Sequence, residues 1–432
     1  MTRRIMLTAD AVGGVWRQCL ELAAGLTARG GPVLLAVMGP HPSREQFEEV
    51  SALSGCEVAV TDLPLDWTAD SPEMLRHASM RLAGLAGAWR ADSIQLHAPA
   101  LAGMGGAAGG QARAGGVRGV RVDSRFRGND EGGARDDGGT PGEGGTPGGG
   151  GSPGGGGTAG EGGLRDDGGL LSVRSWPAPV VAMAHSCVGT WWRAVRGGDL
   201  PPDLAWRAEM TRCGLLNADV VAAPSQSFAD ELVAFYRLKR PVHVIPNGAQ
   251  PIGMPRTPMP HALTAGRLWD AGKNIATLDE AAALCGVPVR AAGSVHGPNG
   301  ASIVARHLRL LGNLGPAALA CEYAHAAVFV SVARYEPFGL AVLEAAQAGC
   351  ALLLSDIPTY RELWSGAAGF VDPSDPAAVA AMLRDMIADP ASCARRGELA
   401  RRRALCFTAD AMAAATWALH RDLVAAPAMA AE

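Results

Sequence analysis

Short apolar runs separated by polar or glycine-containing segments recur along the chain. Clear examples are Arg4–Leu7, Pro179–Ala184 and Ala327–Ser331, in which most residues are apolar. Runs of this length and composition are typical of strands that are buried on both faces of a parallel sheet. Parallel strands are joined by crossover connections, which are usually helices. The pattern therefore predicts an α/β protein.

The segment after the first run predicts a glycine-containing loop and an amphipathic helix. The loop covers Thr8–Gly14, and Gly30 is placed to end the helix. One apolar face of this helix is formed by Val15, Cys19, Leu22 and Leu26. Dinucleotide-binding domains also start with a strand, a glycine turn and a helix, but their G-x-G-x-x-G fingerprint is absent from this turn. The pattern gives little support to a nicotinamide-dependent oxidoreductase.

Between Gly103 and Ser172 the chain changes character, because glycine, proline and small or charged polar residues replace the apolar runs. Local repeats occur there, since Gly138–Pro141 recurs as Gly144–Pro147. Such a segment cannot bury enough apolar surface to offset the entropy of ordering it, so we predict that residues 103–172 are disordered. The stretch Val122–Asp130 resembles a translated bacterial dispersed repeat, which indicates an insertion. Closing a longer loop costs only about 0.6 kcal/mol per doubling, so the surrounding fold can survive it.

Composition and charge exclude several classes of function. The chain has 432 residues, a net charge of −4 and a pI near 6.2, so no basic field attracts nucleic acid. Arginines at 395–396 and 401–403 fit the solvated side of a late helix and leave at most a weak association with a membrane surface. Nine cysteines without a C-x-x-C pair indicate reduced thiols. With no signal peptide and no apolar run of transmembrane length, we expect a cytoplasmic protein.

Two carboxylates, Glu336 and Glu344, stand eight positions apart and enclose Pro337 and Gly339. Glu336 follows the predicted strand 327–331. It should therefore lie near the carboxyl end of that strand, where open α/β sheets bind ligands. Pro337 suits the first position of a helix, because its missing N–H would have no helical partner there. We therefore predict a helix that starts at Pro337.

A helix start at this place would form an anion site. The free amides of Phe338, Gly339 and Leu340 would carry the positive end of the helix dipole, which suits a phosphate. At about 1.5 Å of rise per residue, Glu344 would lie about 9 Å farther along the axis than Phe338. Two carboxylates at such a separation can hold hydroxyl groups at opposite ends of one ligand. A nucleotide-sugar meets these demands with its sugar, its diphosphate and its ribose.

This segment resembles the E-x7-E signature of retaining glycosyltransferases, in particular those of family 4. The segments that follow keep the family's order: Ala345–Gly349, the apolar run Ala351–Leu354, and Gly369–Pro376. The resemblance implies the GT-B fold, with two Rossmann-like doubly wound domains facing a cleft. It places an acceptor-side domain at residues 1–246, which contains the insertion, and a nucleotide-sugar donor domain at 247–410. A last helix at 411–425 would return to the N-terminal domain.

A second likeness to the family lies at Leu263–Asn274. By this resemblance Arg267 and Lys273 hold the donor diphosphate, although Lys273 stands six positions after Arg267 where five is commoner. Arginine offers a planar fork to two phosphate oxygens, whereas lysine supplies a movable point charge. The resemblance also assigns donor binding to Gly13, Gly14, Phe338, Gly339, Leu340 and Glu344.

Two histidines follow other predicted strands. By the resemblance, His185 at the end of the run 179–184 contacts the donor sugar and acts in catalysis together with Glu336. His97, after a strand near Ile94, is a candidate for contact with the acceptor. The sequence has no Cys and His pairs at zinc spacing and no acidic motif dedicated to a metal. We expect neither a metal nor a resident cofactor, and the nucleotide-sugar would be a co-substrate.

The sequence thus predicts a retaining, hexosyltransferase-like enzyme that moves a sugar from a nucleoside-diphosphate sugar to an unidentified acceptor hydroxyl. The resemblance implies that the nucleoside diphosphate departs through an oxocarbenium-like state while the acceptor attacks from the same face. Electrostatic stabilisation of the leaving group would then carry the catalysis. The alternative is a non-catalytic nucleotide-binding remnant that the insertion at 103–172 has disabled, although intact Glu336, Glu344, Arg267 and Lys273 argue against long decay.

Overall fold

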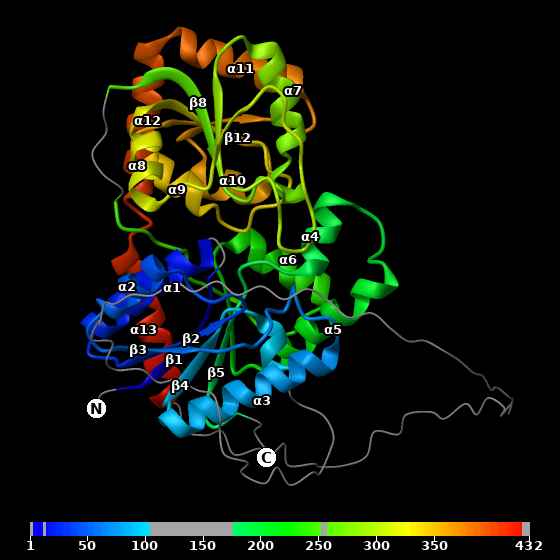
Figure 1. Cartoon of the computed structure of the whole chain (residues 1–432), viewed down its shortest axis with the longest axis vertical. Coiled ribbons are helices and arrows are strands. Elements are labelled where there is room, and N and C mark those ends of the chain that lie inside the picture. Colours follow the sequence, from blue (N-terminus) through cyan, green and yellow to red (C-terminus); the bar gives the residue numbers. More distant parts are fainter. Residues whose placement is uncertain (1–2, 12–13, 104–175, 252–256, 426–432) are drawn as a thin grey trace, which may run out of the picture. The chain divides into compact units, whose positions relative to one another are not determined.

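The computed structural model describes residues 3–11, 14–103, 176–251 and 257–425 (Figure 1). The insertion predicted at 103–172 lies outside the described residues except for Gly103, and so does the candidate Gly13. Within the described ranges, the strands gather into two parallel sheets, one before and one after residue 257. Strands and helices alternate along the chain, which confirms the predicted α/β class.

In the described part of the chain, the first sheet has seven parallel strands in the order β3-β2-β1-β4-β5-β6-β7. Their bounds are β1 (Ile5–Asp10), β2 (Val33–Met38), β3 (Cys56–Val60), β4 (Ser93–Leu96), β5 (Val180–Met183), β6 (Val220–Ala223) and β7 (His243–Val244). Successive residues of a strand point to opposite faces. Met6 accordingly joins one apolar core, whereas Ile5 and Leu7 join another. Both faces are buried, which explains why the run is apolar throughout.

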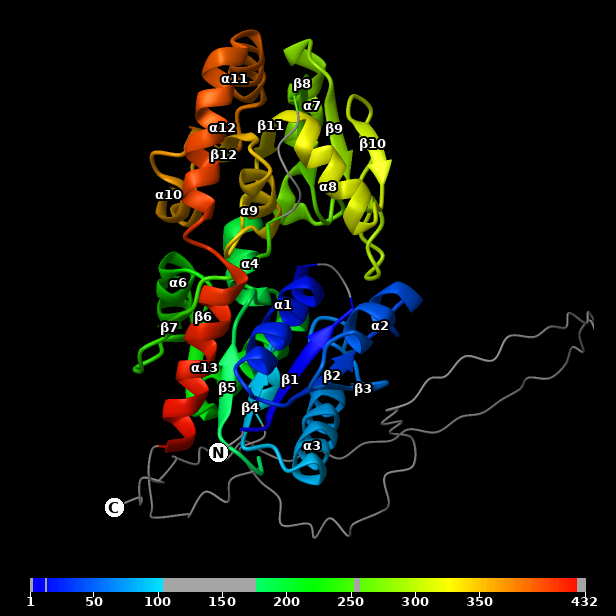
Figure 2. The ribbon, with the colours of Figure 1, turned by 90° about the vertical axis from the view of Figure 1, so that its left-hand side faces the viewer.

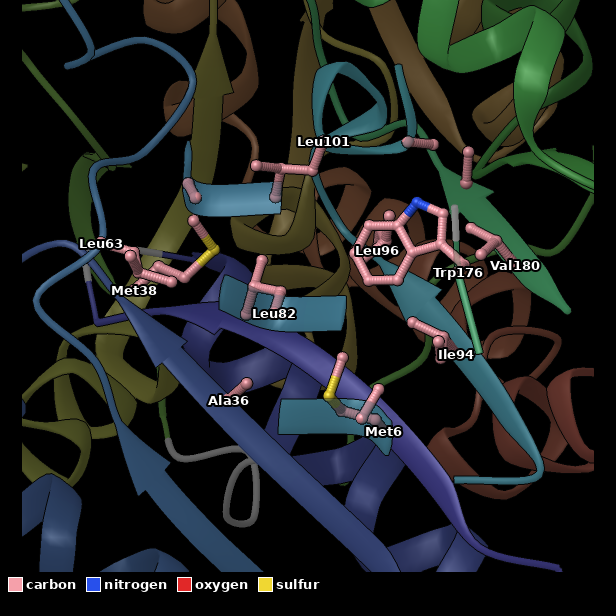
Figure 3. Close-up of a cluster of buried hydrophobic side chains, with 14 of the residues drawn as sticks. Met6, Ala36, Met38, Leu63, Leu82, Ile94, Leu96, Leu101, Trp176 and Val180 are labelled. Carbon is pink, nitrogen blue, oxygen red and sulfur yellow. The ribbon is translucent and has the colours of Figure 1, made fainter. Parts of the chain in front are cut away.

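Helices cover both faces of this sheet. Their bounds are α1 (Gly14–Ala28), α2 (Arg44–Ser51), α3 (Pro72–Trp89), α4 (Val188–Val195), α5 (Pro202–Asn217) and α6 (Gln226–Tyr236), with a 3₁₀ turn η1 (Pro99–Ala102). On one face, Leu82 of α3 packs in the same core as Met6 and Ile94 (Figure 3). On the other face, Leu22 and Leu26 of α1 pack with residues of β1 and β2. The apolar side predicted for this first helix is therefore its buried side.

The second sheet has, among the described residues, six parallel strands in the order β10-β9-β8-β11-β12-β13. Their bounds are β8 (Met259–Ala265), β9 (Val289–Ala292), β10 (Arg309–Gly312), β11 (Ala326–Ser331), β12 (Ala351–Ser355) and β13 (Ala368–Val371). Phe329 of β11 packs in one core, and its neighbours Val328 and Val330 pack in the core of the opposite face. This sheet is also buried on both sides.

The helices around the second sheet separate into two layers, one for each core. Their bounds are α7 (Ile275–Cys285), α8 (Pro316–His325), α9 (Leu340–Gln347), α10 (Pro358–Trp364), α11 (Pro376–Ala388) and α12 (Pro390–Ala404), with a 3₁₀ turn η2 (Ala271–Lys273). Leu278 of α7 and Leu383 of α11 share one core. Leu343 of α9 and Leu363 of α10 share the other.

Each sheet contains one position at which the strand order reverses. In the first sheet it lies between β1 and β4, and in the second between β8 and β11. The connections diverge there, which leaves a crevice at the carboxyl ends of the strands where doubly wound proteins bind ligands. His97 directly follows β4, Arg267 follows β8, and Glu336 follows β11. The doubly wound arrangement is confirmed, and the predicted site residues stand at its two switch points.

The last described helix, α13 (Ala409–Ala425), lies against α1 and forms part of a layer on the first sheet (Figure 2). Gly25 of α1 approaches it so closely that a Cβ at this position would lie 2.3 Å from the Cβ of Ala413. Arg29 donates a hydrogen bond of 2.7 Å to the carboxylate of Asp410. His420 of α13 is fully buried beside β4. The C-terminal helix is therefore a structural part of the N-terminal sheet.

None of the helices within the described ranges has both the length and the apolar character that a membrane span requires. The nine cysteines are all free thiols. Cys321 and Cys406 are exposed, and the others are at least partly buried.

Candidate active site

The clearest candidate site lies at the carboxyl end of the second sheet, next to its switch point. Lys273 donates a hydrogen bond from Nζ to Oε2 of Glu336, and the two form an ion pair. Both side chains are largely buried, with 23% and 13% of their surfaces exposed. The structure thus brings together two residues that are 63 positions apart in the sequence and that were predicted independently. A cation and an anion meet where α/β sheets bind ligands.

Lys273 stands one residue farther from Arg267 than is common, and the loop between them accommodates this additional residue. Asp270 accepts a hydrogen bond of 2.8 Å from the backbone N–H of Gly272 and caps the turn η2. A 3₁₀ turn advances only about 2.0 Å per residue, much less than an extended chain. The turn therefore takes up the additional residue, and the Lys273 side chain reaches Glu336.

Asn274 anchors this loop and was not among the predicted site residues. Its backbone is left-handed, with a φ of 56°, a conformation that asparagine tolerates better than most residues. Its side-chain amide donates to the carbonyl oxygens of Val332 at 3.0 Å and of Pro373 at 2.7 Å. The Lys273 loop is thus tied to the segments that follow β11 and β13. The available signal was an asparagine directly after a Gly-Lys turn.

Arg267 lies near the start of this loop, just after β8, and pairs with Asp270. Its guanidinium donates to the Asp270 carboxylate at 3.2 Å and lies over the ring of Trp269, 5.7 Å from its centroid. Asp270 also accepts a hydrogen bond of 3.1 Å from the indole N–H of Trp191. With 43% of its side chain exposed, Arg267 is oriented by its neighbours and still accessible to an anion.

The helix between the two glutamates begins later than predicted. α9 starts at Leu340, and Gly339 caps it with a φ of 94°. A left-handed residue cannot continue a right-handed helix back toward Pro337, and glycine adopts this conformation without a steric penalty. The prediction of a helix start at Pro337 is therefore wrong.

This later start also changes which amides are free at the anion site. In a helix that begins at Leu340, the unpaired N–H groups of the first turn belong to Leu340, Ala341 and Val342. Phe338 and Gly339 precede the helix, so the expectation that their amides form its first turn is wrong as well. Phe338 is 3% exposed and instead contributes its ring to the core.

Glu344 lies in the second turn of α9. It is four residues past Leu340, or about 6 Å along the axis at about 1.5 Å per residue, rather than the predicted 9 Å. Tyr323 donates a hydrogen bond of 3.1 Å from its hydroxyl to Oε2 of Glu344. Burial raises the pKa of the Glu344 carboxyl, and the hydrogen bond from Tyr323 partly opposes this shift. The carboxylate retains acceptor capacity for the hydroxyl groups of a ligand.

At the first sheet, the structure places the two predicted histidines side by side. His185 follows β5 and His97 follows β4, with ring centroids 5.0 Å apart and planes inclined by 54°. Burial lowers the pKa of His185 to about 4, so its ring is neutral near pH 7. Among the described residues, its buried Nε2 has no hydrogen-bond partner. As part of a neutral imidazole, this Nε2 can accept or donate one hydrogen bond to a ligand.

Gly14 is the first residue of α1, directly beyond the carboxyl end of β1 at the switch point of the first sheet. Its neighbour Gly13 lies outside the described residues. Within the part of the chain that the structure describes, no three His, Cys, Asp or Glu side chains gather in a group that could hold a metal ion.

Two buried polar residues next to His97 were not predicted. Gln95 of β4 and His420 of α13 hydrogen-bond to each other, although they are 325 positions apart in the sequence. No motif or spacing connects residues at such a distance. A glutamine inside the short strand Ser93–Leu96 was the available signal, because a buried polar side chain requires a partner.

Three protein-family models match different parts of the chain. The family described as "Glycosyl transferases group 1" matches residues 302–403, which include Glu336 and Glu344. "Glycosyltransferase Family 4" matches residues 167–251, which include His185. "Glycosyl transferase 4-like domain" matches residues 13–144.

Curated relatives include D-inositol 3-phosphate glycosyltransferase of Streptomyces avermitilis, which is 30% identical over 288 residues, or 57% of this chain and 61% of the relative. Glycogen synthase of Mycobacterium tuberculosis is 39% identical over 102 residues, or 23% of this chain and 25% of the relative. The chain therefore spans less than two thirds of the length of each of these relatives.

Solved structures of similar fold include sucrose-phosphate synthase from Thermosynechococcus elongatus, with a TM-score of 0.69 and 18% identity over 98% of this chain and 100% of that one. Anabaena HepE in complex with UDP-glucose has a TM-score of 0.63 and 14% identity over 97% and 99%. WaaG, a glycosyltransferase involved in lipopolysaccharide biosynthesis, has a TM-score of 0.61 and 12% identity over 96% and 99%. At such identities the likeness shows the fold, which is GT-B.

Proposed function

Since the chain belongs to the family 4 type of GT-B glycosyltransferases, we propose that it is a retaining enzyme that transfers a sugar from a nucleoside-diphosphate sugar to an acceptor hydroxyl. The observation that carries this proposal is the Lys273–Glu336 ion pair at the switch point of the second sheet. It combines a cation for a diphosphate with a carboxylate for sugar hydroxyls. The α9 start beyond Glu336 adds unpaired amides that suit a phosphate.

The donor would bind with its diphosphate against Lys273, Arg267 and the first turn of α9. Lysine and arginine bind phosphate oxygens in complementary ways, as a point charge and as a planar fork. Glu344, one turn beyond the amides, would accept hydrogen bonds from the ribose hydroxyls. If a donor phosphate binds Lys273 in place of Glu336, the Glu336 carboxylate becomes free to bind the sugar.

In the proposed reaction, the bond between the anomeric carbon and the phosphate oxygen breaks, and its electron pair stays on the departing diphosphate. The acceptor oxygen bonds to the same carbon from the same face, and its proton passes to the leaving phosphate oxygen. Negative charge grows on the diphosphate during this step. Preorganised cations and amides stabilise such developing charge better than water does.

His185 would contact the transferred sugar as a neutral imidazole. With its pKa lowered to about 4, it would not place a second positive charge beside an oxocarbenium-like sugar. Its unpartnered Nε2 provides the hydrogen-bonding position. Together with Glu336 it would form the catalytic pair that the sequence predicted.

We further propose that the reaction needs no resident cofactor and takes place in the cytoplasm, where nine free thiols remain reduced. Two of the similar proteins named above act on different substrates by their titles, one on D-inositol 3-phosphate and one in glycogen synthesis. The identity of the acceptor is therefore left as an unassigned hydroxyl compound.

The test is calorimetric titration of the purified protein with UDP, GDP, ADP and NAD. We expect one nucleoside diphosphate to bind and NAD not to bind. Lys273→Ala should weaken that binding about 10- to 100-fold, because a hydrogen bond to a charged group contributes about 1.5–3 kcal/mol. Lys239→Ala removes an exposed lysine and is the matched control, which should bind as the unaltered protein does.

If the folded protein binds no nucleoside diphosphate, the donor site is not where we place it. Binding without turnover of any matching nucleotide-sugar, offered with a panel of hydroxyl acceptors, would instead favour the non-catalytic remnant. Tight binding that Lys273→Ala leaves unchanged would contradict the role of the ion pair.

A further inference from the structure

A chain of hydrogen bonds runs through the first sheet from α13 to His97. Ser93 Oγ lies 2.9 Å from Nδ1 of His420, and Nε2 of His420 lies 3.1 Å from Oε1 of Gln95. Nε2 of Gln95 lies 2.8 Å from Nε2 of His97, and Nδ1 of His97 lies 3.0 Å from Sγ of Cys19. Each contact is within hydrogen-bonding distance. Ser93, Gln95, His420 and Cys19 are buried, whereas His97 is half-buried.

The amide of Gln95 sets the direction of this chain. Its nitrogen can only donate and its oxygen can only accept, so it donates to His97 Nε2 and accepts from His420 Nε2. A neutral imidazole has one donor and one acceptor nitrogen. His97 therefore carries its proton on Nδ1 and donates toward Cys19, while His420 carries its proton on Nε2 and accepts from Ser93. Each ring nitrogen and each amide atom in the chain thus acts either as a donor or as an acceptor.

Both ring nitrogens of His97 are consequently occupied by the protein. A charged His97 would need acceptors at both nitrogens, and Gln95 would have to turn its oxygen toward it. That rotation would point the amide nitrogen at His420 Nε2, which already carries a proton. Placing a charge on His97 thus requires the whole chain to reverse. His97 therefore has no free nitrogen to offer an acceptor molecule.

The ionisable groups that face His97 come from several elements. Cys19 lies on α1, His185 follows β5, and His420 lies on α13, while Asp10 at the end of β1 acts on Cys19. Burial, followed by the proximity of His185 and then of His420, lowers the pKa of His97. Burial also raises the pKa of the Cys19 thiol, with Asp10 adding to the shift. All members of the chain are neutral near pH 7.

What His97 presents to the site is its ring, which contacts His185 at 5.0 Å between centroids. The backbone N–H of His97 donates to Oγ1 of Thr8 at 2.9 Å, so the ring is fixed from the main chain as well as from both nitrogens. No residue in the described ranges pairs with Nε2 of His185, so its ring depends on such packing for its orientation. A mobile neighbour would leave the His185 ring without a fixed support.

We propose that Gln95 and His420 are positioning residues for His185, because they hold His97 as a fixed and uncharged support for the His185 ring. This inference rests on the proposed function for its catalytic consequence. The C-terminal helix α13 thereby takes part in the organisation of the active site. The residues concerned touch neither the donor nor the acceptor.

The first test is nuclear magnetic resonance of the full-length protein with ¹⁵N-labelled histidine. The ring nitrogens report directly which atom carries the proton. We expect His97 to show a single tautomer protonated at Nδ1, and His420 one protonated at Nε2, with neither titrating between about pH 5 and 8. A His97 that titrates in this range, or that exchanges between tautomers, would overturn the proposal.

The second test compares kinetic constants of three variants, with any donor that supports turnover. Gln95→Met keeps the side-chain length and removes both hydrogen bonds, and Ser93→Ala removes only the outermost one. We expect Gln95→Met to lower kcat about 10- to 100-fold with a donor KM within about threefold, because small displacements of a catalytic group have such effects. Ser93→Ala should have a smaller effect of the same kind. His77→Gln, at an exposed position of α3, is the control.

An unchanged kcat in a Gln95→Met protein whose His97 has lost its fixed tautomer would overturn the positioning role. Should Gln95→Met fail to fold, Ser93→Ala and the spectrum of the unaltered protein still decide the question. The absence of turnover with every donor would count against the proposed function, whereas the tautomers of His97 and His420 can be measured without any activity.

Discussion

The two sheets have the same reversal of strand order, yet the polar groups at their switch points differ in kind. The second sheet presents paired charges, Lys273 with Glu336 and Arg267 with Asp270. The first sheet presents His97 and His185, both neutral, with His97 in a directed chain of hydrogen bonds. Folding has thus placed charged pairs at the switch point of the second sheet and neutral histidines at that of the first.

The difference matches the two chemical partners of the proposed reaction. A diphosphate is an anion that gains charge as it leaves, so it needs cations whose counterions can be exchanged. A sugar in an oxocarbenium-like state is electron-poor, so it needs hydrogen bonds without additional positive charge. Doubly wound sheets of the same topology can therefore serve opposite electrostatic purposes through the side chains at the switch point.

The largest effect should come from removing the negative half of the ion pair. Glu336→Gln keeps the shape of the side chain and leaves Lys273 without its counterion. We expect kcat to fall about 100-fold or more, as it does when a preorganised polar group is lost from an active site. Affinity for the nucleoside diphosphate should rise or stay the same, because Lys273 no longer has a competing carboxylate. Calorimetry and initial rates measure the two quantities.

A reduced affinity in Glu336→Gln would contradict this picture, because it would mean that Glu336 holds the nucleotide rather than competing for Lys273. Glu398→Gln, which removes an exposed carboxylate that pairs with arginines of α12, is the matched control. Both constants should remain those of the unaltered protein.

An intermediate effect is expected at the α9 cap. Gly339 has a φ of 94°, and a Cβ at this position would lie 3.3 Å from Tyr360 and from Val342. Gly339→Ala should therefore lower the free energy of unfolding by about 1–2 kcal/mol, the cost of a left-handed conformation for a residue with a Cβ. Nucleotide affinity should fall with it, because the first-turn amides shift. Denaturant titration and calorimetry provide the measurements.

The paired variant Gly84→Ala makes the same chemical change in the exposed middle of α3. A Cβ there meets nothing within 4 Å, so alanine should raise stability by about 0.5–1 kcal/mol. If both variants shifted stability in the same direction, the assigned backbone conformation of Gly339 would be wrong.

The last prediction concerns the pH dependence of stability at the first sheet. Burial lowers the pKa of His420 to about 4, below its ordinary value of 6.5. The unfolded chain therefore binds a proton at this residue before the folded chain does. The contribution of neutral His420 is complete above pH 6.5 and declines as the pH falls toward about 4. Denaturant titration across this range measures the free energy of unfolding. This free energy should change less steeply with pH in His420→Gln than in the unaltered protein, with His77→Gln as the exposed control.

Much of this architecture can be predicted from local sequence. The runs at residues 4–7, 179–184 and 327–331 became β1, β5 and β11, because a strand buried on both faces must be apolar throughout. The helix after β1 ends at Ala28, and Gly30 follows it with a φ of 82°. The positions of Lys273 and Glu336 were also predictable. Lys273 follows β8 and Glu336 follows β11, and these two strands are neighbours in the sheet.

The failures have equally specific causes. Pro337 carries a real preference for helix starts, but the left-handed Gly339 two residues later overrides it. The engagement of both His97 nitrogens was also missed, because its side-chain partners are Cys19 of α1 and Gln95 of its own strand, and Gln95 is held in turn by His420 of α13. Tertiary partners decide whether a histidine nitrogen is available, and no spacing in a single sequence reports them.

The last helix has a consequence for how this protein is made. The strand β1 is synthesised long before α13, yet the polar chain within its sheet remains incomplete until His420 has been added. Until then, Gln95 has an unpaired oxygen inside an apolar layer, which is unfavourable. A nascent or truncated chain would therefore hold its N-terminal sheet in an unfinished state. The proposed active site therefore reaches its final form only after α13 has been synthesised.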